Sequence, residues 1–257
     1  MTALSVKARP GVTARGSLRG RAFGAALAAG AALAALPCLA EQAAAPKMEA
    51  PKTEALKPKG AAPAKSQMTF DIVRKGDKIG VNVVDIERKG DTVTVKNKTD
   101  ISVKVLGFEA YRFAHASSET WKGEQLVAFA SQTDDNGKKH AVKVEPGPTP
   151  DKLTLTVDGK KSEEPKSLTP GTLWSRALLS RTDLFEPGEG TLMTVSVKDL
   201  GDEKITVGGV ERHARHYQLT AKAPADFDRD LWFDGDELLR LKLVGSDKSV
   251  IVSDLVK

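Results

Sequence analysis

The sequence is poor in cysteine, in aromatic residues and in recognisable catalytic motifs. Its 257 residues include one cysteine, Cys38, and aromatic residues make up 5% of the chain. A single cysteine near the N-terminus excludes a small disulfide-stapled scaffold, so the fold must be held together by its core. The chain has no nucleophile elbow, glycine-rich phosphate loop, histidine-rich zinc signature or cysteine-based motif. We therefore expect neither an enzymatic activity nor a cofactor.

The first 40 residues have the pattern of an export signal. They contain five basic residues and no acidic residue, and an apolar stretch follows from Ala22 to Ala40. This pattern predicts a secretory signal peptide over residues 1–40, cleaved after Ala40, and hence a periplasmic protein. An uncleaved membrane anchor is the alternative, since about 18 apolar residues can just span a bilayer. Lipid attachment at Cys38 is disfavoured because Pro37 replaces the small residue expected before a lipidated cysteine.

Most of the positive charge belongs to this leader. The whole chain has 39 Lys+Arg and 34 Asp+Glu, and removing the five basic residues of the leader leaves 34 of each. The exported protein is then near neutral, which argues against a nucleic-acid partner. Residues 41–67 are rich in Ala, Pro, Lys and Glu and predict a disordered linker, either a tether or a solubilising tail. The folded domain is expected over residues 68–257.

Turn pairs and alternating apolar residues predict that this domain is mainly β. Residues 103–144 are interpreted as three long strands joined by turns at Lys122–Gly123 and Asn136–Gly137. Both faces of the first of these strands carry apolar residues, as in a strand that is covered on both sides or lines a barrel. Similar turn signals along the chain predict a single curved antiparallel meander sheet, a half-barrel or barrel of about ten strands. Residues 172–181 predict one short covering helix, capped by Thr172.

Several phrases of the sequence resemble a known family. They are FEAYRFAH at 108–115, ETWKGEQL at 119–126, TDDNG at 133–137, Trp174, and DLWFD at 230–234. The chain resembles an exported bacterial family that carries only a domain-of-unknown-function label, DUF6134. More distantly, it is similar to the periplasmic half-barrels that carry lipoproteins. The resemblance implies a curved antiparallel sheet with an apolar concavity, and it implies no activity and no catalytic residues.

Three clusters of polar residues are candidates for a chemical site. His213 and His216 have the spacing of a metal pair on a helix, but on a strand residues three apart point to opposite faces. Five acidic residues between Asp226 and Glu237 fit part of a calcium loop, yet Leu231 stands where that loop needs glycine. Glu119 and His115 share a strand face at roughly 13 Å, which is too far for an acid–base pair. We expect Glu119 to pair with a cross-strand Lys or Arg, and we expect no metal site and no catalytic residues.

The remaining functional signal is an apolar concavity in an exported protein. We predict that it binds a hydrophobic small molecule, a lipid or an acyl chain. The alternative is an envelope interaction or structural module whose concavity is filled by its own core, with an envelope protein as its partner. Contact with the membrane is expected only through the export signal. The candidate residues of the ligand cavity are Phe108, Tyr111, Phe113, Trp121, Phe129, Trp174 and Trp232.

Overall fold

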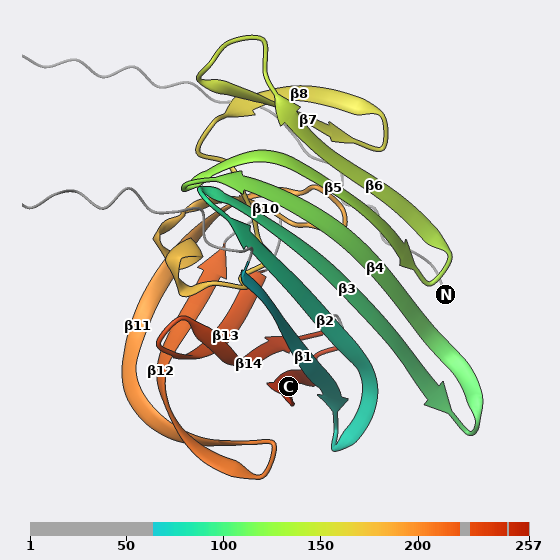
Figure 1. Ribbon diagram of the computed structural model, residues 1–257. Coiled ribbons are helices and arrows are strands. Elements are labelled where there is room, and N and C mark those ends of the chain that lie inside the picture. The colour runs from blue at the N-terminus through green and yellow to red at the C-terminus, as the bar shows by residue number, and fades with distance from the viewer. Residues whose placement is uncertain (1–63, 222–226, 246, 257) are drawn as a thin grey trace, which may run out of the picture. The chain divides into compact units, whose positions relative to one another are not determined.

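Short glycine turns fold the domain into a meander of strands (Figure 1). The computed structural model describes residues 64–221, 227–245 and 247–256. Two-residue turns such as Asn136–Gly137 have positive φ at both positions, which matches the twist of hairpin strands. The N-terminal half comprises β1 Ala64–Arg74, β2 Asp77–Lys89, β3 Thr92–Val105, β4 Phe108–Lys122, β5 Gln125–Asp135, β6 Lys138–Pro146, β7 Lys152–Val157 and β8 Lys160–Pro165. The C-terminal half comprises β9 Thr169–Pro170, β10 Asp183–Phe185, β11 Leu192–Val207, β12 Val210–Ala221, β13 Phe227–Asp234, β14 Glu237–Val244 and β15 Val250–Leu255.

All of these strands belong to one 15-stranded sheet. The two halves join where β1 pairs with β15, and from there the strand order runs outward to β8 on one side and to β9 on the other. Neighbouring strands are antiparallel, with the exception of β9 and β10. Because β8 and β9 are the two ends of the order, the sheet is not closed.

The inner faces of the two halves pack against each other. Val95, Phe129 and Val144 of the N-terminal half are almost fully buried in the same cluster as Leu219 and Leu231 of the C-terminal half. Burial of each such side chain stabilises the fold by roughly 1.5–3 kcal/mol. We call the face that carries Phe129 the inner face of the sheet and the opposite face the outer face.

A second, smaller core lies on the outer face of the C-terminal half. Leu231 and Phe233 belong to the main core, whereas Trp232 between them packs with Ile205, Val207, Ala214 and Leu239. This arrangement explains why three consecutive residues of β13 are buried, although successive strand residues point to opposite faces.

The mainly β class and the single antiparallel meander sheet are confirmed, but two details of the prediction are wrong. The sheet has 15 strands instead of about ten. The expected covering helix is replaced by a 3₁₀ helix of five residues, Arg176–Ser180, capped by Ser175 and not by Thr172. Leu173 has a φ of 53°, a left-handed conformation that an α-helix cannot contain.

The interpretation of residues 103–144 missed one turn. The turn at Asn136–Gly137 lies where it was predicted, and the one predicted at Lys122–Gly123 falls one residue later, at Gly123–Glu124. Val103–Val105 belongs to β3, and an additional hairpin turn falls at Leu106–Gly107. β1 begins at Ala64, four residues before the predicted domain start. The predicted signal peptide, Cys38 and the linker up to residue 63 lie outside the described residues. Among the residues that are described, none forms a helix long and apolar enough to cross a membrane.

Candidate functional site

The aromatic residues predicted to line one ligand cavity lie in three different environments. Trp121, Phe129 and Trp174 are buried in the main core, where Phe129 packs edge-on against Phe185 with ring centroids 4.9 Å apart. Trp232 belongs to the second core. Phe108 is 79% exposed, and Tyr111 and Phe113 lie on the same strand, exposed and half-buried respectively. The seven residues therefore do not gather around one cavity.

Glu119 joins β4 to the segment before the 3₁₀ helix. Its carboxylate accepts hydrogen bonds from the indole Nε1 of Trp121 at 2.7 Å and of Trp174 at 3.1 Å. The expected Lys or Arg partner is replaced by these two indoles. Burial raises the pKa of the Glu119 carboxyl, and the Thr172 hydroxyl and the two indoles partly offset that rise. With 1% of its surface exposed, Glu119 is sealed from solvent and holds the Trp174 segment on the core.

A row of polar side chains crosses the inner face beyond this apolar region. Asn82, Thr99, His115, Thr133 and His140 are register partners on β2 to β6. The Asn82 amide donates to the Thr99 hydroxyl at 2.7 Å, and His115 Nδ1 lies 2.9 Å from Thr133 Oγ1. Burial lowers the pKa of His115 to about 4, so this ring is neutral at pH 7. The hydrogen-bond partner of His115 is thus a threonine hydroxyl, and Glu119 on the same strand is bonded to indoles instead.

The side chains of the two remaining clusters are engaged in contacts with neighbouring strands. His216 stacks on Trp232 at 4.2 Å and lies 2.9 Å from Asp230 and 3.1 Å from Glu203. Among the acidic residues that fit part of a calcium loop, Asp234 and Glu237 both pair with Arg212, and Asp230 pairs with Lys242. Asp226 is outside the described residues. Within the described residues, no group of three or more His, Cys, Asp or Glu side chains is arranged to hold a metal ion.

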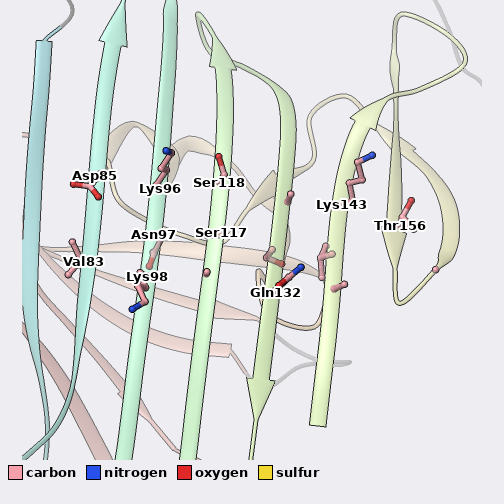
Figure 2. Close-up of a pocket in the computed structure, with 16 residues that line it drawn as sticks. Val83, Asp85, Lys96, Asn97, Lys98, Ser117, Ser118, Gln132, Lys143 and Thr156 are labelled. Atoms are coloured by element: carbon pink, nitrogen blue, oxygen red, sulfur yellow. The ribbon is translucent and has the colours of Figure 1, made fainter. Parts of the chain in front are cut away.

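A large hollow lies on the outer face of β2 to β7 (Figure 2). It is a shallow trough of about 780 Å³. Its floor consists mainly of small residues, Ala116 and Ser118 on β4, Ala130 on β5 and Ala141 on β6, with the longer Gln132 in register between Ala116 and Ala141. The alanine and serine side chains fill little space on the outer face, whereas the longer side chains of Lys96 and Lys98 on β3 and Lys143 on β6 line the same hollow. The trough residues are Val83, Asp85, Lys96, Asn97, Lys98, Ala116, Ser117, Ser118, Ala130, Ser131, Gln132, Ala141, Val142, Lys143, Thr156 and Gly159.

Three lysines stand along the rim of this trough. Lys143 pairs with Glu145 at 2.6 Å and Lys98 with Asp100 at 3.0 Å, while Lys96 forms no ion pair within the described residues. A second hollow, of about 550 Å³, shares Lys98, Ala116, Gln132 and Ala141 with the first and extends it towards Ala114. The trough therefore continues along β4 in the direction of the β3–β4 turn.

The trough was missed by sequence reasoning that looked for aromatic residues. The available signal was the alternation in β4, where Ala114, Ala116 and Ser118 alternate with the buried His115, Ser117 and Glu119. Alternation shows that one face of a strand is free of large side chains. It does not show whether that face is covered or open, which required the structure.

Comparison with known proteins places this domain in a family. A family described as "Domain of unknown function (DUF6134)" matches residues 70–255. No curated protein matches the chain. The match spans β1 to β15 and therefore includes every strand of the trough.

Proposed function

Since the chain belongs to the DUF6134 family, which is defined as a domain of unknown function, we propose a function from the site itself. The protein is a non-enzymatic, periplasmic binding protein that holds an amphipathic molecule, an acyl chain with an anionic group, in the outer trough. The observation that carries this proposal is an alanine-floored trough of about 780 Å³ with lysines along its rim. The ligand class is the one expected from the sequence, but its site is moved from the inner to the outer face.

The dimensions and lining of the trough support an extended apolar chain. Ala116, Ala130 and Ala141 present methyl groups on three adjacent strands, and Val83 adds apolar surface at one side. Each methylene removed from water contributes about 0.8 kcal/mol. A shallow trough covers one side of an acyl chain, so we expect roughly half of that contribution and a moderate affinity.

The rim supports an anionic group at one end of the ligand. Lys96 is free of carboxylate partners within the described residues, and the pairs of Lys98 and Lys143 are exposed to solvent. Exposed ion pairs contribute about 0–1 kcal/mol, so a carboxylate or phosphate can replace Asp100 or Glu145 at little cost. A lysine ammonium recognises either anion as a compact point charge.

Two further observations support a binding protein over an enzyme. Glu119 is sealed in the core and held by two indoles, and the neutral His115 has a threonine as its partner.

Location in the periplasm is supported by the basic and apolar pattern of residues 1–40.

A pair of matched variants tests the proposal. Ala130→Phe fills the trough from its floor, whereas Ala128→Phe places the same ring on the same face of β5, two residues away and outside the trough. We expect Ala130→Phe to weaken binding of a fluorescent fatty acid at least about tenfold, which corresponds to the loss of about three to four methylenes at half of the full contribution of each. Ala128→Phe should bind like the wild type. Absence of binding by the wild type, or equal binding by both variants, would contradict the proposal.

The second candidate function is an envelope interaction module. It is favoured by the main core, in which Trp121, Phe129 and Trp174 fill the inner side of the sheet. Native mass spectrometry of the protein from its host separates the two functions. A stoichiometric lipid mass supports the ligand-binding function, whereas a lipid-free mass together with a co-purified protein supports the module.

A further inference from the structure

The β3–β4 hairpin projects beyond both neighbouring strands (Figure 1). Pairing of β3 with β2 ends at Ile101, and pairing of β4 with β5 begins at Phe113. The Asn136 N–H still donates to the Arg112 carbonyl at 2.8 Å, so residues 102–111 form a two-stranded ribbon that has no lateral strand partner within the described residues. At about 3.3 Å per residue, its four residues per strand extend roughly 13 Å past the rest of the sheet.

The tip of this ribbon is apolar and open to solvent. Leu106 is 93% exposed, Phe108 is 79% exposed and Val105 is 56% exposed. Val105 and Phe108 face each other across the turn as register partners. Other hairpin turns of the sheet place Lys75, Asn136 and Asp158 where this turn has Leu106.

Leu106 adopts a conformation that its side chain disfavours. Its φ is 52°, followed by 85° at Gly107, which is the left-handed pair of a two-residue hairpin turn. Asn or Gly fits the first position, and a bulky apolar residue there is a genuine outlier. An exposed leucine in a strained conformation does not stabilise the fold. Its presence therefore points to a binding role, in which its side chain contacts an apolar surface outside the protein.

We propose that this tip, formed by Val105, Leu106 and Phe108, inserts into the interface of a lipid bilayer. The size of the tip favours a bilayer over a protein partner. A stable protein interface needs about 800 Å² on each partner, which three side chains on a two-stranded tip do not supply. An interfacial segment buries its apolar side chains about 5–10 Å into the bilayer boundary, a depth that the ribbon can reach.

The residues behind the tip suit the headgroup region. Lys104 and Arg112 flank the apolar residues and form no ion pair within the described part of the chain, whereas the Glu109 carboxylate accepts a hydrogen bond from the Ser102 hydroxyl at 2.8 Å. Tyr111, opposite Val103 and directly before Arg112 on β4, is 36% exposed. Tyr, Lys and Arg behind an apolar tip are typical of a membrane interface, where the cations meet anionic phosphates.

This inference does not depend on a ligand in the trough. It adds a second membrane contact, made by the β3–β4 tip, to the one expected from the N-terminal region. The trough extends along β4 towards the base of the ribbon at Arg112. A membrane-bound tip would bring the end of the trough close to the bilayer, where acyl chains are found.

Vesicle binding by the full chain tests the inference. Co-sedimentation with phosphatidylcholine vesicles, with and without phosphatidylglycerol, is measured for the wild type and for the double variant Leu106→Asn, Phe108→Ser. We expect the double variant to lose binding at least about tenfold, because the apolar contribution of both side chains is removed. The matched control is Val210→Ser, which removes an exposed valine (60% exposed) beside the Gly208–Gly209 turn and should bind like the wild type.

Two further measurements separate membrane contact from folding. Leu106→Asn alone should raise the Tm, because Asn suits the positive φ, and should still weaken vesicle binding. Phe108→Trp should show fluorescence that vesicles containing brominated lipid quench. Failure of the wild type to bind vesicles, equal binding by the double variant, or no quenching of Phe108→Trp would overturn the inference. Loss of a captured protein in the double variant, with vesicle binding unchanged, would overturn it too.

Discussion

On the inner face of β4, His115, Glu119 and Trp121 are buried, whereas on the outer face of the same strand Ala116 and Ser118 are exposed. The inner residues have partners from other strands and loops, and the outer residues form the floor of an open trough. One strand thus separates two tasks by side-chain alternation. Residues that hold the fold together alternate with residues that form the floor of the proposed ligand site, so a substitution on one face is expected to leave the other face intact.

The largest expected loss of stability comes from removing a large buried side chain from the inner face. Phe129→Ala should lower the free energy of unfolding by about 3–5 kcal/mol, since it removes a ring that is 1% exposed and packed against Phe185. Ala130→Ser, on the outer face of the same strand, should change it by less than about 0.5 kcal/mol. Urea denaturation measures both. A loss below about 1 kcal/mol for Phe129→Ala would show that the inner face is not a filled core.

Lowering the pH should decrease the free energy of unfolding because His115 is buried in its neutral form on the inner face. Its pKa is lowered to about 4 by burial, below its value in the unfolded chain, so its stabilising contribution is complete above the unfolded value of 6.5. That contribution is lost as the pH falls from 6.5 towards 4 and amounts to about 3 kcal/mol in total. His115→Gln should remove this part of the acid sensitivity. Unfolding free energies of the two proteins at pH 7 and pH 4.5 check the difference; parallel losses would refute it.

Glu119 should respond to pH in the opposite direction. Its pKa is raised by burial, so its contribution is most favourable below the unfolded pKa and declines as the pH rises through the folded value. Glu119→Gln keeps an acceptor for Trp121 and Trp174, and its stability relative to the wild type should increase between pH 5 and pH 8. Glu119→Leu removes that acceptor and should cost about 1–3 kcal/mol. Equal stability of the Leu and Gln variants at pH 8 would contradict the role of the two indole hydrogen bonds.

Much of the fold could be predicted from local signals, and the failures have physical causes. Turn pairs such as Asn136–Gly137 tolerate positive φ and correctly marked hairpins. The turn at Leu106–Gly107 was missed because leucine rarely adopts that conformation. β8, with the sequence KKSEEP, has no apolar residue to reveal a strand, and β9 has two residues, which explains the low strand count.

The candidate site was predictable only in part. The ligand-cavity residues were predicted from their aromatic character, but in this protein aromatic residues such as Trp121 and Trp174 pack in the hydrophobic core. The odd or even position of a residue in a strand tells which residues share a face. Whether the other half of the sheet covers that face depends on how all the strands pair, which the sequence pattern of one strand does not contain. That pairing joins β1 to β15 from opposite ends of the domain, which no local pattern encodes.

The most direct test of the account is to find which face of the sheet a ligand touches. Methyl NMR of the alanine- and valine-labelled protein, titrated with a fatty acid, observes both faces in one experiment. We predict shifts at Ala116, Ala130 and Ala141 on the outer face and unchanged signals from Val95 and Val144 on the inner face. Shifts confined to Val95 and Val144 would place the ligand inside the core and contradict the assignment of the site to the outer trough.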